Sequence, residues 1–517
     1  MPGFRSFAAL VAAFAVLASA AHGAPPGLGN HQHHQKLHKR ATVTSTIHST
    51  TTVVYDGRAP IREPTFWHSH PAAGSSSSTS SASKSSSVAS IYSSSASVSS
   101  SSASKSSASA SISSANATTS VTAYPTSTGT TTTTPAKLRG VNIGGWLVLE
   151  KWMNSDVFSG TNATDQYSFD ETTGAEAKLQ AHWESYFNET DVATIASWGI
   201  NALRIPIGYW AYNNSGTPYI SGADAYMEKA IGWARAYGLK VLVDCHGSPG
   251  SQNGFDNSGR AGDVSWQSGD NLQLSIDVLE TMAAKYGAEE YADVVFGLEL
   301  VNEPISWSPN NFTLSKQWAQ EATAAVKAKA TNPDLMVIMH DGFMGPSNWA
   351  RTGLAVNGNA TNANAKFAVD IHLYQNQVAA DSLLNQAQHI AKACNWTQSE
   401  LLPANSSLPV YVGEFSAATN ICVNPDGTTL AGSTCTVSGC QCADTVSIQY
   451  WNSPLVQATR KFLEAELDAF EHSSRGWFMW SYKGPGAWGM TNAVKYGLIG
   501  AKVTDRMFPN QCNSTSS

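Results

Sequence analysis

Charged residues are scarce in this chain of 517 residues. Asp, Glu, Lys and Arg together make up 13% of it, and the formal net charge is −7. Proteins that bind nucleic acid need clustered positive charge to neutralise phosphate groups. This weakly acidic composition gives no basis for such a cluster, so we expect no nucleic-acid partner.

Long apolar segments are almost absent. The exception follows Arg5, where FAALVAAFAVLASA leads to the small residues AHG before Ala24. This pattern is typical of a cleaved export signal, here residues 1–23. The run is too short to span a bilayer well, and no other segment is long enough. We therefore expect a secreted, extracellular protein, with cell-wall association as a further expectation, and no membrane span in the mature chain.

Two segments after the signal lack the residues that a folded core requires. Residues 24–40 end in the dibasic pair Lys39-Arg40, which indicates a pro-segment. Residues 41–136 are rich in Ser and Thr, and from Ser75 to Ser114 the chain is nearly all Ser and Ala. Such low complexity cannot bury enough apolar area to offset the loss of chain entropy. We expect a disordered N-terminal extension that acts as an O-glycosylated stalk or linker.

Cysteine is also sparse, with seven residues in all. An exported chain favours disulfides, and the odd number leaves at least one thiol unpaired. Cys245 lies within the apolar run KVLVDCHG and is our candidate for the free thiol. A zinc site in the later cysteine cluster is the alternative, although the cluster has no nearby histidine. Pairing stays open among Cys422, Cys435, Cys440 and Cys442.

From residue 137 onward, apolar β-branched runs alternate with segments of helical periodicity. Eight such runs read as strands: LRGVNIGGW, NALRIPIGYW, KVLVDCHG, VVFGLELVNEP, LMVIMHDG, KFAVDIHLYQ, LPVYVGEFS and GWFMWSYK. The alternation indicates βαβ units, and eight parallel strands close a barrel. An open doubly wound sheet is the alternative, but the Gly-rich dinucleotide loop expected after its first strand is missing. The sequence therefore predicts a (β/α)8 TIM barrel covering residues 137–517.

Active sites of such barrels lie at the C-terminal ends of the strands. Two glutamates stand at these ends, Glu303 in GLELVNEP and Glu414 in VGEF, on strands four and seven. These strands lie on opposite sides of a barrel mouth, as a two-carboxylate glycosidase requires. One carboxyl group would protonate the leaving oxygen, and the other would attack the anomeric carbon. Further polar or aromatic residues near the predicted strand ends are Asn142, Glu150, Arg204, Asp244, His246, Asn302, His340, Asp341, His372, Tyr374 and Trp480.

Some of these residues have a structural alternative. Glu299 would point into the barrel interior and need a buried partner, and Arg204 is either that partner or a site residue. His340 and Asp341 either belong to the site or cap the following helix. A metal site made of three histidines is the rival chemistry, but paired glutamates need no metal, so we expect no metal and no cofactor. Its ligands would be His246, His340 and His372.

With these residues in place, the sequence resembles glycoside hydrolase family 5. The motifs NEP and GEF carry the resemblance, and LRGVNIGGWLVLE, DCHGSPGSQNGFDNSG, ACNW and the segment around Trp480 are similar to those of the secreted fungal exo-β-1,3-glucanases. The resemblance covers residues 137–512 and implies a retaining enzyme that releases glucose from the non-reducing ends of β-1,3-glucan. We expect the protein to act as a monomer on this polysaccharide.

The resemblance also implies residue roles. Glu303 would be the acid/base and Glu414 the nucleophile. Glu150 would hold hydroxyl groups at a closed pocket end, and Phe255 would be one aromatic ring of a clamp at the pocket mouth. A disulfide between Cys394 and Cys512 is implied. The supporting residues would be Arg204, His246, Asn302, His372, Tyr374 and Trp480.

Three positions depart from the family pattern. Gln377 stands where the second clamp aromatic is expected, Trp152 replaces a tyrosine-like residue, and the Cys-rich segment after Asn420 is expanded. The change at Gln377 keeps β-1,6 or mixed linkages open. Endo action on the same barrel is another alternative, for which the pocket wall at Glu150 is the discriminating feature, and transglycosylation is a variant, because sugar can intercept a covalent intermediate as easily as water. A glucan-binding wall protein without catalysis is a further alternative, which the presence of both glutamates disfavours.

Overall fold

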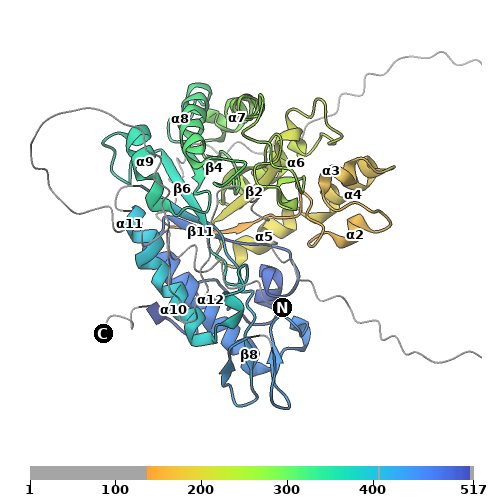
Figure 1. The fold of residues 1–517 in the computed structure, drawn as a ribbon, viewed down its shortest axis with the longest axis vertical. Coiled ribbons are helices and arrows are strands. Elements are labelled where there is room, and N and C mark those ends of the chain that lie inside the picture. Colours follow the sequence, from red (N-terminus) through yellow and green to blue (C-terminus); the bar gives the residue numbers. More distant parts are fainter. Residues whose placement is uncertain (1–136, 406–407, 433, 513–517) are drawn as a thin grey trace, which may run out of the picture. The chain divides into compact units, whose positions relative to one another are not determined.

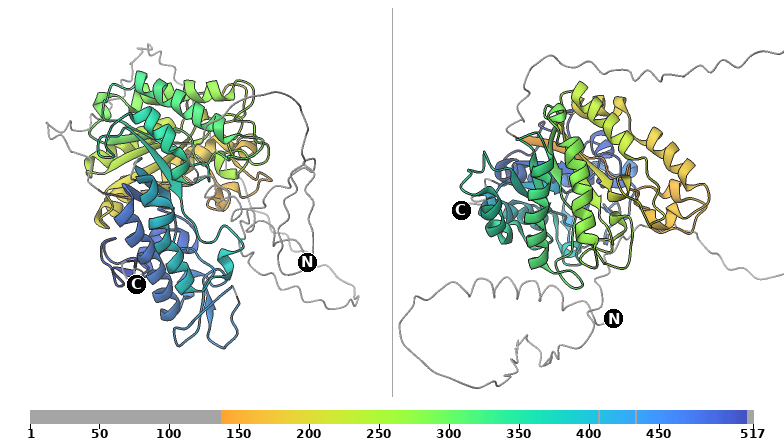
Figure 2. Two further views of the ribbon diagram at one scale, coloured as in Figure 1. Left: turned by 60° about the vertical axis from the view of Figure 1, so that its left-hand side comes forward. Right: turned by 90° about the horizontal axis from the view of Figure 1, so that it is seen from above.

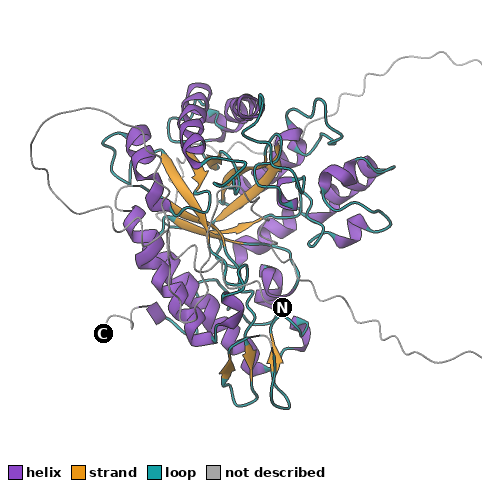
Figure 3. Cartoon of the chain, in the orientation of Figure 1, coloured by secondary structure: helices purple, strands orange, loops and turns teal. Residues whose placement is uncertain are grey.

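The computed structural model describes residues 137–405, 408–432 and 434–512. Within them, eight parallel strands close into a barrel in the order β1-β11-β7-β6-β5-β4-β3-β2. Figure 3 shows the strands at the centre with helices around them. The predicted (β/α)8 barrel is thus confirmed. The expected signal, pro-segment and stalk, residues 1–136, lie outside the described residues.

Each barrel strand coincides with one of the eight apolar runs. The strands are β1 (Leu138–Asn142), β2 (Ala202–Gly208), β3 (Lys240–Gly247), β4 (Val295–Glu299), β5 (Met336–His340), β6 (Phe367–His372), β7 (Val410–Glu414) and β11 (Gly476–Met479). Nearly all their residues are buried. Strands of a parallel barrel are covered on both faces, which explains why they read as continuous apolar runs.

Helices cover the outside of the barrel (Figure 1). Those between successive strands are α6 (Asp224–Ala236), α7 (Asn271–Tyr286), α8 (Phe312–Lys329), α9 (Ala350–Asn357), α10 (Gln386–Trp396) and α12 (Ser453–Ser473), with α4 (Ala175–Tyr186) and α5 (Glu189–Ser197) before β2. Shorter helices are α2 (Ser155–Phe158), α3 (Gln166–Asp170), α11 (Leu402–Asn405) and α13 (Met490–Lys495). Among these described helices, none is long and apolar enough to cross a bilayer.

The barrel interior is apolar at one end and charged further along. A cluster of apolar side chains fills the end from which the strands start: Leu138, Ala202, Leu242, Phe296, Met336, Ile338, Ala368, Tyr411 and Phe478. Side chains two residues apart on a strand share a face, so Arg204 follows Ala202 into the interior, and Asp370 follows Ala368. The apolar plug therefore forms a floor beneath a layer of buried charges.

A small sheet is inserted between β7 and α12. Its strands β8 (Cys422–Val423), β9 (Thr429–Leu430) and β10 (Gln441–Cys442) pair in the order β10-β8-β9, and β8 lies at the lower edge of Figure 1. Disulfides join Cys422 to Cys442 and Cys435 to Cys440. All four cysteines of the cluster are thus paired with one another, which leaves none of these thiols for the alternative zinc site.

A third disulfide joins α10 to the C-terminal segment. It links Cys394 to Cys512, 118 residues apart in the chain. The helix α12 packs against α10 in the same region, and Figure 2 shows the blue C-terminal helices beside the teal ones. Cys245 is a free, buried cysteine on β3. These pairings agree with the disulfide that the resemblance implied and with the expected free thiol.

Candidate active site

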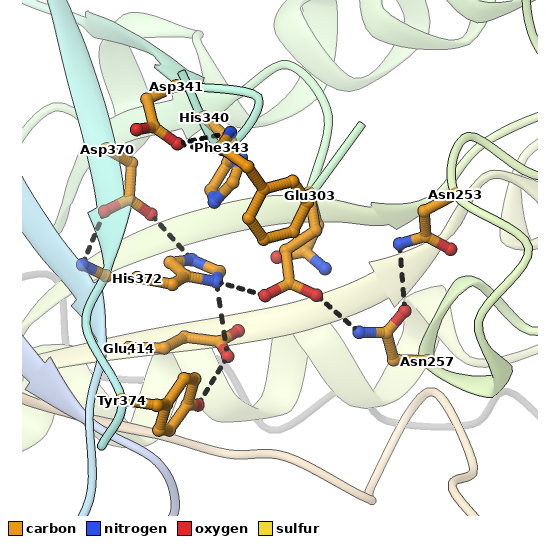
Figure 4. A network of polar contacts seen from close by, with 12 residues as sticks. Asn253, Asn257, Glu303, His340, Asp341, Phe343, Asp370, His372, Tyr374 and Glu414 are labelled. Atoms are coloured by element: carbon orange, nitrogen blue, oxygen red, sulfur yellow. Dashed lines mark hydrogen bonds and ion pairs between the residues drawn. The ribbon is translucent and has the colours of Figure 1, made fainter. Parts of the chain in front are cut away.

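Glu303 lies just beyond β4, with its backbone in the left-handed region at φ 47°. This conformation is unfavourable for a residue with a side chain and is found mostly where function holds it. Its carboxylate is held from two sides (Figure 4): His372 Nδ1 lies 2.8 Å from Oε1, and Asn257 donates to Oε2 at 2.7 Å. The side chain is therefore fixed in position and largely buried.

Glu414 is the last residue of β7 and is also buried. Arg204 Nη1 donates to its Oε1 at 2.9 Å, and the Tyr374 hydroxyl donates to Oε2 at 2.8 Å. His372 Nδ1 lies 3.4 Å from that same Oε2. Figure 4 shows Glu414, His372 and Glu303 in one connected network. The two glutamates predicted from the strand ends are thus brought to the same imidazole.

Arg204 is fully buried and contacts acidic groups on both sides. Its Nε donates to Glu299 Oε2 at 2.8 Å, while Nη1 contacts Glu414 as above, and Nη2 lies 3.2 Å from Asp244 Oδ2. Burial opposes the charged form of Arg204, but Asp244, Glu299 and Glu414 outweigh it and hold its pKa well above the ordinary value. Arg204 is therefore both the buried partner of Glu299 and a residue of the candidate site, the two roles that the sequence left as alternatives.

Asn302 and His246 contribute polar atoms that lack a protein partner. Arg204 Nη2 donates to Asn302 Oδ1 at 2.8 Å, and His246 Nδ1 lies 2.7 Å from Asp244 Oδ2 while its ring stacks on Trp480. Asn302 Nδ2 and His246 Nε2 are buried without a hydrogen-bond partner among the described residues. Buried polar atoms are nearly always hydrogen-bonded in native proteins, so these two fit a site that a polar ligand completes.

Glu150 lies at one end of the site, against an aromatic wall. Trp152 Nε1 donates to its Oε2 at 2.9 Å. The Trp152 ring contacts Trp488 at 5.2 Å between centroids, and Trp488 contacts Tyr374 at 5.3 Å. Burial, followed by the negative charge of Asp256, raises the pKa of Glu150 well above its ordinary value. Glu150 is therefore connected through the side chains of Trp152 and Trp488 to the tyrosine that contacts Glu414.

Phe255 and Asn257 belong to the loop after β3. Phe255 is half-buried and directly precedes a turn at Asp256–Ser258, from which Asn257 reaches Glu303. Asn253 fixes this loop, because its Oδ1 accepts from the Phe255 amide at 2.8 Å and its Nδ2 donates to Asn257 Oδ1 at 3.1 Å. The sequence indicated Phe255 but not Asn257. An asparagine in a Gly-rich loop reads as a turn residue, so no local signal marked it.

Asp341 does not cap a helix, which corrects one of the two expectations for it. Its carboxylate accepts from the amides of Phe343 at 2.9 Å and Gly345 at 2.8 Å, and the short 3-10 helix that follows at Pro346–Trp349 has no side-chain cap. It therefore stabilises the turn after β5. His340 accepts from the Gly342 amide at 3.1 Å, and its ring contacts His372 at 4.3 Å between centroids.

The charge state of the site centres on His372. Burial opposes its charged form, but Glu414, Asp370 and Glu303 together hold the pKa of His372 well above its ordinary value. Burial likewise raises the pKa of Glu414, an effect that His372 and Arg204 only partly offset. For Glu303, the contacts from His372 and Asn257 outweigh burial, so its pKa lies below the ordinary value. In the free site, His372 therefore carries the proton next to an ionised Glu303.

The donor atoms here do not suit a metal ion. A carboxylate oxygen of Glu303 and ring nitrogens of His340 and His372 lie within 4.8 Å of one another, a different set from the three histidines weighed above. However, both ring nitrogens of His372 face carboxylates, Nδ1 toward Glu303 and Nε2 toward Asp370 at 3.2 Å. A doubly protonated imidazole has no lone pair to offer a metal.

Comparisons with known proteins place the chain in a family. The family model described as Cellulase (glycosyl hydrolase family 5) matches residues 164–482. A probable glucan 1,3-beta-glucosidase A of Emericella nidulans is 39% identical over 395 residues, which cover 73% of this chain and 93% of that protein. Glucan 1,3-beta-glucosidase I/II of Saccharomyces cerevisiae is 36% identical over 408 residues, covering 74% and 88%.

Solved structures share the fold. The rutinosidase from Aspergillus niger superposes with a TM-score of 0.54 at 20% identity, covering 70% of this chain and 97% of that one. At this identity the likeness concerns the fold alone. The family match and the two relatives, taken with the barrel that they share, show that this chain belongs to glycosyl hydrolase family 5.

Proposed function

We propose that the protein is a retaining exo-β-1,3-glucanase that releases glucose from the non-reducing ends of β-1,3-glucan. One observation carries the mechanism: His372 Nδ1 contacts Glu303 Oε1 at 2.8 Å and Glu414 Oε2 at 3.4 Å. Both distances start at the same nitrogen atom, so the two carboxylate oxygens are separated by no more than the sum of these distances, which is below about 6.5 Å. Retaining enzymes separate their carboxyl groups by about 5–5.5 Å and inverting enzymes by about 6.5–9.5 Å. The arrangement supports retention.

In the first step, Glu303 protonates the leaving oxygen while Glu414 attacks the anomeric carbon. The glycosidic bond breaks as a covalent glucosyl ester forms on Glu414. Water, deprotonated by Glu303, then attacks the same carbon and releases β-glucose and free Glu414. Asn302 Nδ2, which has no protein partner among the described residues, is positioned to donate to the sugar 2-OH. Hydrogen bonds to the 2-OH strengthen in the oxocarbenium-like transition state, so this contact would contribute more as the glycosidic bond breaks.

The acid form of Glu303 arises by a proton transfer within the site. The Nδ1 proton of His372 moves to Glu303 Oε1, which leaves a neutral imidazole and a carboxylic acid. The same transfer removes the negative charge of Glu303, which raises the pKa of Glu414, and the positive charge of His372, which lowers that pKa by more. Arg204 keeps its charge and is then the cation that favours the ionised nucleophile. Arg204 and Tyr374 hold that nucleophile in place.

Exo action is supported by the wall at Glu150. Burial raises the pKa of the Glu150 carboxyl group well above its ordinary value, which favours the protonated form, and that form both donates to and accepts from sugar hydroxyls. Trp152 and Trp488 lie beside Glu150, and we infer that this wall closes the pocket beyond one glucosyl unit. The names of the relatives support β-1,3-glucan as the substrate.

An extracellular location completes the proposal. The three disulfides of the described residues are typical of proteins that mature in an oxidising compartment. Residues 1–40 would be removed during export, and residues 41–136 would act as a stalk or wall tether. N-terminal sequencing of the mature protein from a culture medium or wall extract tests this part, and an intact residue 1 in either fraction would contradict it.

NMR of the earliest products from a linear β-1,3-glucan tests the catalytic proposal. β-Glucose as the first product supports retention and a closed pocket. α-Glucose would contradict retention and the role given to Glu414. Oligosaccharides as primary products would contradict exo action and the role given to Glu150.

A further inference from the structure

Two large aromatic side chains are exposed together next to the site. Trp307 lies in the loop after β4, four residues beyond Glu303, and Phe343 lies in the loop after β5. Their exposed fractions are 37% and 38%, and their ring centroids are 5.9 Å apart with 43° between the planes. Both side chains therefore stay more than one-third exposed although the two rings are in contact. Such a pair suits the apolar face of a ligand.

The loop that carries Phe343 is held in a costly conformation. Phe343 has φ 62°, in the left-handed region that bulky residues rarely adopt. The Asp341 carboxylate maintains it by accepting from the amides of Phe343 and Gly345. The hydroxyl of Ser306 donates to Gly342 O at 2.7 Å, which ties the loop of Trp307 to that of Phe343. Backbone strain that is fixed this firmly is characteristic of functional sites.

Trp307 and Phe343 lie on the same side of the site as Glu303, and the wall of Trp152 and Trp488 lies on the side of Glu414. Phe343 contacts the His340 ring at 5.1 Å between centroids, and a His340 ring nitrogen lies within 4.8 Å of a Glu303 carboxylate oxygen. Figure 4 shows the Phe343 ring at this end of the network. The wall of Trp152 and Trp488 instead adjoins Tyr374 and, through it, Glu414. An acid that protonates the leaving oxygen faces the departing sugar, so rings on its side adjoin that sugar.

We propose that Trp307, supported by Phe343, is the platform on which the leaving-side glucosyl unit stacks. The proposal rests on the function proposed above and names a residue that determines its leaving-side specificity. It also accounts for Gln377, where the resemblance leads one to expect a second clamp aromatic: a ring from the loop after β4 takes the place of the missing one. Its ligand is the glucosyl unit just beyond the bond that is cut, whose axial C–H groups form an apolar face.

Two substrates separate this role from a structural one. Laminaritriose places sugar on the leaving side, whereas β-glucosyl fluoride places only a fluoride ion there. Truncating a central aromatic contact costs more than about 1 kcal/mol, so Trp307→Ala should lower kcat/KM for laminaritriose about tenfold. It should leave kcat/KM for β-glucosyl fluoride unchanged. Trp307→Phe should recover most of the loss. Tyr450→Ala, which removes a ring that is 68% exposed on the Cys-rich insertion, is the matched control and should equal the wild type on both substrates.

An equal loss on both substrates would overturn the proposal, because Trp307 would then act through the fold or through Glu303. Wild-type activity of Trp307→Ala on both substrates would overturn it as well. If the proposed β-1,3 activity is wrong, the wild type itself will show this, because it will turn over β-glucosyl fluoride but not laminaritriose. In that case the same comparison is made with the β-glucotriose that the wild type does cleave, and a selective loss there supports the platform.

Discussion

His372 Nδ1 and Glu303 Oε1 are joined by a hydrogen bond of 2.8 Å. In the proposed mechanism this contact keeps the proton for the acid step on the imidazole, because the pKa of His372 is raised and that of Glu303 is lowered. The two groups therefore titrate as a unit. The pH above which the acid proton is lost is then set by a stabilised imidazolium and not by an isolated carboxyl group.

Replacing His372 should narrow the pH range of activity from both sides. In His372→Asn, Glu303 alone carries the acid proton, so the alkaline limb of kcat/KM moves to lower pH. Glu414 loses a positive neighbour that lowers its pKa, so the acidic limb moves to higher pH. We expect a loss of about 10²-fold or more at the optimum, the size of a general-acid contribution. Rates on laminaritriose across pH measure this, because its sugar leaving group needs the acid proton, and an unshifted profile would contradict proton storage on His372.

Azide should separate the roles of the two glutamates. In Glu303→Ala the glucosyl ester on Glu414 still forms from a substrate with a good leaving group, and azide then attacks it to give β-glucosyl azide. In Glu414→Ala azide attacks the substrate directly and gives α-glucosyl azide. NMR of the products distinguishes the two anomers. The reverse pattern would exchange the roles of Glu303 and Glu414.

Asn257 is expected to be a positioning residue for the acid. Hydrogen bonds to charged groups contribute about 1.5–3 kcal/mol, so Asn257→Ala should lower kcat/KM about 10- to 100-fold. It also removes one of the contacts that lower the pKa of Glu303, so the pKa of the Glu303–His372 pair should rise. Asn257→Asp, which places a negative charge there, should raise it further. The pH profiles and melting temperatures of both variants test this; a uniform loss at every pH, with a lowered melting temperature, would indicate a purely structural residue.

Glu466, on α12, is predicted to destabilise the fold at neutral pH. Neither carboxylate oxygen has a hydrogen-bond partner among the described residues, and burial raises its pKa well above the ordinary value. The unfolded chain has a glutamate pKa of about 4.3. The unfavourable contribution of Glu466 to the free energy of unfolding is therefore absent below that pH. It grows as the pH rises toward the pKa of Glu466 in the folded protein. Glu466→Leu should add about 1–3 kcal/mol at pH 7, and less at pH 4.

Thermal unfolding at the two pH values measures the effect of Glu466. Glu464 on the same helix provides the control, since its carboxylate accepts from Arg460 Nε at 2.7 Å and from the Met507 amide at 3.0 Å. Glu464→Gln should lower the melting temperature. A lower melting temperature for Glu466→Leu at pH 7 would mean that this carboxyl group stabilises the fold.

The barrel was readable from sequence because its strands are buried on both faces and therefore appear as apolar runs. Glu303 and Glu414 were readable because strand ends in a barrel converge. The helices α9 and α10 give a weaker signal in the sequence, since few of their residues are strongly apolar; in α10, buried His389 and Cys394 take part in the packing. Asn257, Trp307 and Phe343 lie on loops, where only tertiary contacts decide which side chain reaches the site.

Arg204 illustrates a different limit of sequence reasoning. A single strand position allows two roles, partner of Glu299 or member of the site, which exclude each other only if the side chain has a single partner. A guanidinium has five N–H donors in a fixed plane. In the structure these donors serve Glu299, Asn142, Asn302 and Glu414 at once, so the question had no single answer.

The apolar plug beneath Arg204 determines how the polymer must be handled. Because the barrel is filled below the buried charges, glucose freed beside Glu150 leaves by the same opening through which the chain came in. The shortened glucan has to withdraw before that sugar escapes, and the chain cannot simply advance by one unit. Degradation should therefore be distributive: all chains in a sample shorten together, and none is consumed while its neighbours stay intact.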